Sequence, residues 1–400
     1  MSGRHSHRAD SQDHDGFEVR RGPRTVLLGA LAATLVATII GAVLVWPDRD
    51  KTEDLNDEVT FLADGVSFVR GIVDEVQPAC ASLNDQDETC GQVRATVGDG
   101  ADAEEVTVPV PPEVSDAGLE PGDKLRMLRI PGADGEPVRY SYFGVERSSP
   151  LLLLTLVFVV VVVAVARWRG VRALFGLAFA GLAVLWFMLP ALVSGESGLW
   201  VGVVGSAAIV FVVLYTTHGF SIRTSAAVAG TLAGIGMTAL IGLVSVSTTH
   251  LSGVAEEGGI LKSTVGDLDF QGLLTCAVIV AGLGVLNDVT ITQASAVWEL
   301  RGAGPELTRR HLFTAATQIG RDHIASTIYT IVFAYTGTAL AVLMLIQLYG
   351  LPLTELLATE EIGQEVVRTL ASAIALVLAV PVTTGIAVLT VPGARRVETG

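Results

Sequence analysis

Long apolar runs recur along the whole chain, and no other feature of the sequence constrains the fold as strongly. Each run has roughly 17–25 residues, the length with which an α-helix crosses a hydrocarbon core of about 30 Å. A helix also satisfies its own backbone hydrogen bonds, which makes it a natural spanning element in lipid. Eight runs meet this condition: residues 25–46, 150–166, 171–193, 199–215, 225–246, 272–291, 326–348 and 371–391. The sequence therefore predicts an α-helical polytopic membrane protein with about eight transmembrane helices.

The placement of arginine predicts how these helices are oriented. If the N-terminus lies inside, the tails and loops on that side carry fifteen arginines. The three short loops on the other side then carry only Lys262 and Arg368. Basic residues in short loops stay on the cytoplasmic side of a membrane. We therefore expect a multi-pass protein of the cell membrane with both termini in the cytoplasm.

This orientation divides the chain into five parts. We expect a cytoplasmic basic tail (1–24), a first transmembrane helix (25–46), an extracytoplasmic domain (47–148), a seven-helix transmembrane domain (149–392) and a cytoplasmic tail (393–400). The outer domain holds 23 Asp and Glu against 9 Lys and Arg, and so carries nearly all of the net charge of −15. No basic stripe is present, which argues against a nucleic-acid partner.

Short β-like runs separated by turn signals fill the predicted outer domain. They cover residues 68–76, 92–97, 105–110, 124–130 and 138–145. About five short strands in this length predict a β-rich domain, either a small OB-like barrel or a compact sandwich. Cys80 and Cys90 lie between the first two strands, where an oxidising exterior allows a disulfide between them. Two free thiols are the alternative.

A polar face on the sixth predicted span is the candidate functional region. Asp288, Thr292, Ser295 and Glu299 recur at i, i+4, i+7 and i+11, so they share one side of a helix. An ionised carboxylate at the bilayer centre costs about 2.5–3.5 kcal/mol on insertion scales, so Asp288 must face protein or water or take up a proton. The four residues could line a hydrated path or pack against another polar helix. Alternatively, the span ends near residue 286 and Asp288 is an ordinary carboxylate at the membrane edge.

The residues before and after this face suggest how it is packed. Gly282 and Gly284 are candidate close-packing positions, because the lack of a side chain lets a neighbouring helix approach. Residues 305–319 predict a short cytoplasmic helix that ends at Gly320. That helix is a possible docking element for a cytoplasmic partner. Arg321 and Asp322 are candidate charge partners, and we consider Arg321 paired with Asp288 or Glu299. The alternative is that Arg321 only anchors its helix at the cytoplasmic side.

The stretch 282–340 resembles the YibE/F-like family of bacterial multi-pass membrane proteins. The matching residues are Gly282, Asp288-Val289, Ser295-Ala296, Glu299, Ile319-Gly320-Arg321-Asp322, Thr327 and Ala334-Tyr335-Thr336-Gly337. The chain departs from the family pattern at Gly284-Val285, at Leu286-Asn287, and at His323, where an aliphatic residue is usual. The resemblance implies an N-terminal span and an external β-like domain, and makes Asp288, Glu299, Arg321 and Asp322 better candidates for functional positions. It implies no particular chemistry.

The sequence contains no motif of a familiar enzyme or cofactor site. A P-loop, a nucleophile elbow and an HExxH motif are all missing, and cysteine and histidine do not cluster at zinc spacing. We therefore expect neither an enzyme nor a bound metal or cofactor. The leading hypothesis is a transporter or permease-like protein for an ion or small solute. The alternatives are a permease subunit working with a separate ATPase, and a non-catalytic scaffold or sensor that binds a partner through residues 47–148.

Overall fold

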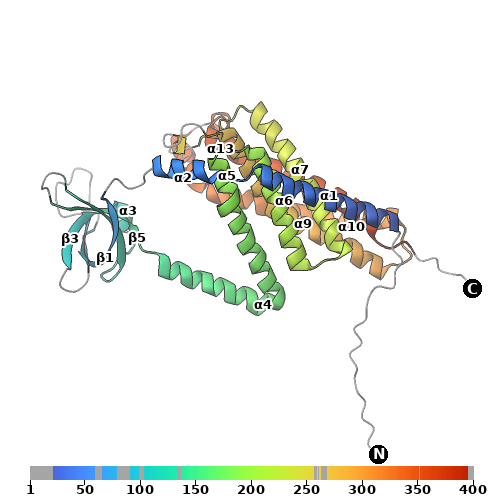
Figure 1. Cartoon of the computed structure of the whole chain (residues 1–400), viewed down its shortest axis with the longest axis horizontal. Helices are drawn as coiled ribbons and strands as arrows, with labels where there is room; N and C mark the ends of the chain where they lie inside the picture. The colour runs from blue at the N-terminus through green and yellow to red at the C-terminus, as the bar shows by residue number, and fades with distance from the viewer. Residues whose placement is uncertain are drawn as a thin grey trace, which may run out of the picture. The chain divides into compact units, whose positions relative to one another are not determined.

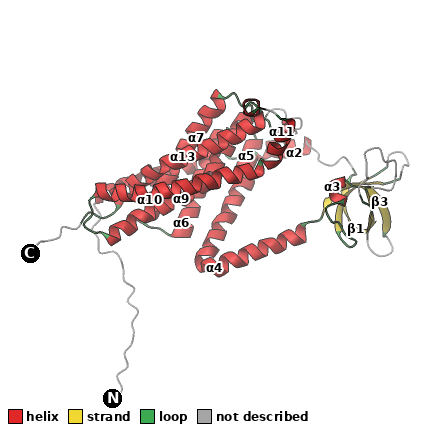
Figure 2. Cartoon of the chain, turned by 180° about the vertical axis from the view of Figure 1, so that it is seen from behind, coloured by secondary structure: helices red, strands yellow, loops and turns green. Residues whose placement is uncertain are grey.

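The computed structural model describes residues 21–394, except for 59–64, 79–90, 99–102, 133–136, 256–258, 260, 263–267 and 351. The chain forms two compact units. One is helical and comprises the segments up to Leu55 and from Trp168 onward. The other, Asn56–Arg167, contains all the described strands. Figures 1 and 2 show the helices and strands of each unit.

Helices make up most of the described chain. In order they are α1 (Arg21–Leu44), α2 (Arg49–Glu58), α4 (Ser148–Ala183), the π-helix η2 (Val184–Met188), α5 (Leu189–Val193), α6 (Gly198–His218), α7 (Ile222–Thr248), α9 (Phe270–Ala303), α10 (Arg309–Thr338), α11 (Leu340–Tyr349), α12 (Leu353–Leu356) and α13 (Glu360–Thr390). Within the described residues, six helices are long and apolar enough to cross a membrane. A seventh is formed if α10 and α11, which are bent by 67° to each other, count as one span.

The helix α4 covers the predicted span 150–166 and the first part of the span 171–193, which η2 and α5 complete. Its backbone leaves helical geometry at Arg167, where φ is 54° and ψ is −133°. This is the position between the predicted runs 150–166 and 171–193, so the apolar segment consists of two helical pieces joined at a sharp break. A positive φ is uncommon for arginine.

The core of the helical unit lies where α7, α9 and α13 pack against one another. Small residues allow this packing. At Gly230 of α7, a Cβ atom would overlap the hydroxyl group of Thr383 on α13. Because Gly230 has no side chain, the two helices approach more closely than any other residue would allow. Further along α7, the hydroxyl groups of Thr231 and of Thr290 on α9 are 2.6 Å apart.

The structure corrects the predicted helix 305–319. Residues 304–308 form the turn between α9 and α10, and Thr308 caps α10 by accepting a hydrogen bond from the backbone N–H of His311. From there α10 continues through Gly320 to Thr338 without a break. A Cβ atom at Gly320 would lie 2.6 Å from Val380 Cγ1 and 2.7 Å from Gln293 Oε1. Gly320 therefore marks a close contact between helices and not a helix end.

The β unit is a curled antiparallel sheet of five strands. The strands are β1 (Ser67–Val76), β2 (Gln92–Val97), β3 (Glu104–Pro109), β4 (Lys124–Ile130) and β5 (Arg139–Val145), and their order is β3-β2-β1-β4-β5. Alternate side chains of β2, among them Val93 and Ala95, are buried on the concave side. The short helix α3 (Pro112–Ser115) lies between β3 and β4 in the chain.

The two edge strands of this sheet are linked by one side-chain hydrogen bond. The phenol of Tyr140 on β5 donates to Oε2 of Glu104 on β3, at 2.8 Å. Burial raises the pKa of Tyr140 above its ordinary value of 10.0, and the hydrogen bond to Glu104 raises this pKa further. The contact helps to hold the sheet in its curled form.

We expect Gly230→Ala to lower the free energy of unfolding by about 1–3 kcal/mol, because the added methyl group overpacks the contact between α7 and α13. Gly236→Ala on the same helix is the matched control, since a Cβ atom there meets nothing within 4 Å. It should be neutral or slightly stabilising, because alanine favours helices. Thermal unfolding in detergent measures both. Equal effects of the two substitutions would contradict the packing described here.

We expect the Tyr140–Glu104 contact to be lost in alkaline solution. A pKa that is raised in the folded state means that the contact stabilises the β unit fully below pH 10.0 and stops doing so as the pH rises through the raised value. Titration of tyrosinate absorbance should therefore include the ionisation of Tyr140 above pH 10.0. Tyr140→Phe should reduce the absorbance change above pH 10.0, and an unchanged titration in that range would contradict the raised pKa of Tyr140.

Candidate functional site

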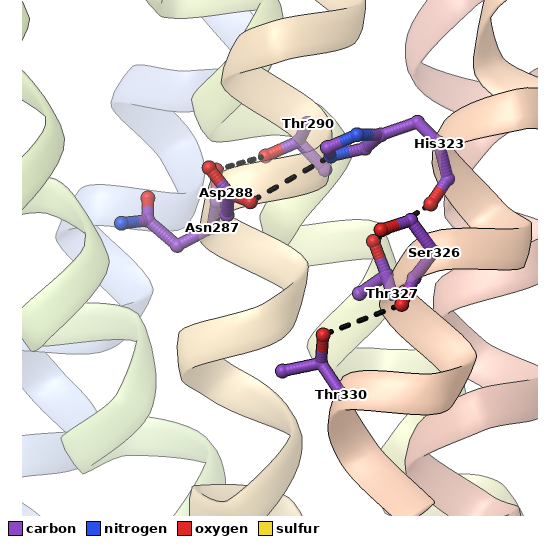
Figure 3. Close-up of polar contacts among 7 residues, drawn as sticks. All are labelled: Asn287, Asp288, Thr290, His323, Ser326, Thr327 and Thr330. Carbon is purple, nitrogen blue, oxygen red and sulfur yellow. Dashed lines mark hydrogen bonds and ion pairs between the residues drawn. The ribbon is translucent and has the colours of Figure 1, made fainter.

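One pair of titratable side chains joins α9 to α10. Nε2 of His323 on α10 lies 3.6 Å from Oδ2 of Asp288 on α9. Figure 3 shows the imidazole reaching across to the carboxylate. The Asp288 side chain is 68% exposed and that of His323 is 32% exposed. The pair thus lies at the surface of the helical unit, on helices whose other faces form the apolar core.

Two threonine hydroxyl groups follow His323 along α10, and both bond to their own helix. Thr327 Oγ1 donates to the carbonyl of His323 at 2.8 Å, and Thr330 Oγ1 donates to the carbonyl of Ser326 at 3.3 Å (Figure 3). Such back-bonding uses the hydroxyl proton within the helix. Thr330 is exposed, so its oxygen can still accept a hydrogen bond from water, whereas Thr327 is buried.

The predicted face of α9 points away from the core. Asp288, Thr292 and Glu299 are exposed, and Ser295 is half-buried. Glu299 Oε1 lies 4.0 Å from Nη1 of Arg223, in the first turn of α7. The two carboxylates of this face are therefore contacted by side chains from two different helices, Asp288 by His323 of α10 and Glu299 by Arg223 of α7.

The structure also corrects the partner considered for Arg321. His323, and not Arg321, reaches Asp288, and Arg223 takes the place next to Glu299. Arg321 precedes His323 by two residues, which turns it about 200° around the helix, away from α9. Arg321 and Asp322 are both exposed, and neither forms an ion pair in the part of the chain that the structure describes.

Gln293 is a buried polar residue that sequence reasoning did not select. Its Nε2 atom donates to the carbonyl of Ala316 on α10 at 2.7 Å and to Thr384 Oγ1 on α13 at 2.8 Å. Its signal in the sequence was an amide within an apolar helix, where a polar group must find a partner. One side chain thereby connects three helices beside the contact of Gly320 with α13.

Arg301 is a second residue that the sequence analysis passed over. It is 2% exposed, near the end of α9. Its Nη1 atom donates to the carbonyls of Pro305 and Leu307, at 3.1 and 2.8 Å. These carbonyls belong to the turn that leads into α10, so Arg301 ties the α9–α10 hairpin together.

The two glycines that were expected to pack closely differ. Gly282 is buried, and a Cβ atom there would lie 3.3 Å from Thr238 Cγ2 and 3.4 Å from Ser372 Oγ. Gly284 is exposed, and a Cβ atom there would meet nothing within 4 Å. Positions two residues apart are separated by about 200° around a helix axis, so Gly282 and Gly284 cannot face the same neighbour. The close-packing role predicted for Gly284 is therefore wrong.

The cysteine and metal predictions concern other parts of the chain. Cys80 and Cys90 lie outside the described residues, so their pairing stays a prediction. Cys276 is buried in α9 as a free thiol. Across the residues placed by the structure, no group of three or more His, Cys, Asp or Glu could hold a metal ion.

The comparison with protein families decides what kind of chain this is. The sequence model of the YibE/F-like protein family matches residues 154–393, more than half of the chain. The chain belongs to the YibE/F-like family. The match runs from α4 to the end of α13 and so includes Asp288, His323 and Gln293. Comparisons with curated proteins and with solved structures gave no match. Family membership and the long apolar helices together suggest a membrane protein.

We expect Gln293→Leu to destabilise this YibE/F-like protein by about 1–2 kcal/mol, because an interhelical hydrogen bond in a membrane protein has this magnitude. The loss leaves the buried Thr384 hydroxyl and Ala316 carbonyl without the amide. Thr292→Val, at the adjacent exposed position, should change the free energy of unfolding little. Chemical unfolding in mixed micelles measures both, and an unaffected Gln293→Leu variant would mean that the bridge does not stabilise the fold.

Proposed function

We propose that the protein is a transporter or permease-like protein of the cell membrane that moves an ion or a small solute. The observation that carries this proposal is the contact of Asp288 with His323 across α9 and α10. Ionisable residues in membrane helices are costly and tend to serve ion or proton pathways. Carboxylate and imidazole groups are the side chains that most often take part in proton pathways through membrane helices. The two side chains can also bind a cation or a polar solute when they are not in contact with each other.

The position of the pair along the bundle supports this reading. Asp288 follows Asp269, the residue that caps α9, by nineteen positions, or about 28 Å of helix. A hydrocarbon core of about 30 Å that begins near Asp269 would place Asp288 close to its inner edge. A solute that binds there is within reach of the cytoplasm while the apolar part of α9 separates it from the other side.

We further propose eight crossings with both termini in the cytoplasm. The break at Arg167 supports two crossings within the apolar segment of α4, η2 and α5, and the bent pair α10 and α11 supports one more. The helix order then brings His218, Arg223, Arg301 and Arg309 to one side of the membrane, as the positive-inside rule requires. Residues 47–148 lie on the other side.

The outer unit is, in this proposal, an OB-like barrel. Its strand order and the short helix between β3 and β4 are what an OB topology requires, and the Tyr140–Glu104 contact brings the edge strands β3 and β5 together. Such domains bind ligands on the face of their second and third strands. This favours a second candidate function, in which the outer unit binds a partner and the membrane helices serve as its scaffold or sensor.

Charge movement in proteoliposomes tests the transport proposal. The purified protein would be offered a panel of inorganic ions, amino acids and small organic acids. We expect a solute-dependent current that Asp288→Asn abolishes and that His323→Gln lowers by at least tenfold. Glu306→Gln, at an exposed position in the α9–α10 turn, should leave the current unchanged.

Two results would contradict the transport proposal. One is a current that persists in folded Asp288→Asn protein, which would separate transport from this carboxylate. The other is silence of the well-folded protein across the whole panel. Silence together with ligand binding by the outer unit would instead support the scaffold or sensor.

A further inference from the structure

A charged surface on α10 lies outside the site described above. Gln318, Arg321, Asp322 and Ala325 recur at i, i+3, i+4 and i+7, so they occupy one side of the helix, here called the α10 face. All four side chains are exposed. Arg321 and Asp322 are adjacent in the chain, and adjacent residues on a helix do not face each other. Arg321 and Asp322 therefore do not pair with each other.

Helix contacts give the depth of the α10 face. Gly320, next to Arg321, packs against Val380 of α13 and Gln293 of α9. From this level α13 continues for ten residues to Thr390, and α10 begins eleven residues earlier at Arg309. The face thus lies about 15 Å inside this end of the bundle.

Exposed apolar side chains occur on both sides of the α10 face. Toward the end of the bundle, Leu389 of α13 is 55% exposed, and its carbonyl accepts a hydrogen bond from Arg309. In the opposite direction along α10, Tyr329 and Phe333 are exposed. In the placement proposed above, Arg321 and Asp322 lie near the level of His323 and Asp288, at the inner edge of the hydrocarbon core. Charges at this edge are covered by protein or by water in preference to lipid tails.

We propose that the α10 face is the contact surface for a second copy of this chain, in which Arg321 of each copy pairs with Asp322 of the other. Copies with the same topology are related by a two-fold axis along the membrane normal, which sets α10 against α10. Arg321 and Asp322 differ in depth by only about 1.5 Å, so each arginine meets the other copy's aspartate at nearly its own level. The charges are self-complementary, and the small side chain of Ala325 allows the helices to approach.

Charge reversal in two differently tagged copies tests the reciprocal pairing. Arg321→Asp gives a face with two acids, and Asp322→Arg gives a face with two bases, so neither should associate with itself. Co-expressed, the two variants should form a mixed dimer in which each of the two contacts again joins an arginine to an aspartate, one of them with reversed polarity. We expect co-isolation of the two tags from the mixed pair at the wild-type level, and at least a tenfold loss for each variant alone. Arg169→Asp, an exposed change on α4, should co-isolate as wild type does.

Disulfide cross-linking gives a second measurement that leaves the charges in place. In a background of Cys80→Ser, Cys90→Ser and Cys276→Ala, Ala325→Cys should form a cross-linked dimer in membranes on oxidation. Leu389→Cys, exposed on α13, should not. The proposal is overturned if each charge variant associates with itself as wild type does, if the mixed pair associates no better than the single variants, or if Ala325→Cys stays monomeric.

Discussion

The amide of Gln293 is the interaction on which the arrangement of the helical unit depends. It lies where α9, α10 and α13 meet, and it donates to a backbone carbonyl of one helix and to a hydroxyl of another. Within an apolar bundle no water is present to accept from the amide N–H groups. The three helices are therefore held at the register in which both N–H groups have an acceptor. Gly320 belongs to the same contact, because any side chain there would displace Gln293 or Val380. These contacts fix the position of α10 along the axis of α9. That register brings Asp288 and His323 next to each other.

This dependence explains which parts of the fold could be predicted from the sequence. The spans are a local property, because some twenty apolar residues form a helix in lipid whatever surrounds them, and the family comparison and the helices agree with a membrane protein. The short β-like runs between turn signals likewise predicted strands without knowledge of their neighbours. Gly320 was interpreted wrongly because its meaning is not local. A glycine that ends a helix and a glycine that allows a second helix to pack closely cannot be told apart in the sequence.

The partner of Asp288 was missed for a related reason. The sequence shows which residues carry charge, and Arg321 is a stronger cation than His323. Only the register between α9 and α10 decides which of them points at Asp288, and a rotation of two residues sends Arg321 to the outer side. The hypothesis of a charge partner on the next helix was useful, whereas the choice of residue required the contact at Gln293. Gln293 itself drew no attention because an amide carries no charge, although a buried amide needs partners as much as an ion does.

Arg301 adds a constraint at the end of the same helix pair. A buried guanidinium is costly, and here two carbonyls of the α9–α10 turn accept from it. Helix ends leave carbonyls unpaired, and a side chain that reaches them from inside the bundle fixes the length and direction of the turn. The hairpin is therefore set at two points, by Arg301 at the turn and by Gln293 about two helical turns further in. Asp288 and His323 lie just beyond the second point, where two helices held in register bring them together. The carboxylate of Asp288 stays exposed while the imidazole of His323 is half-buried beside it, an arrangement that the transport proposed here would use.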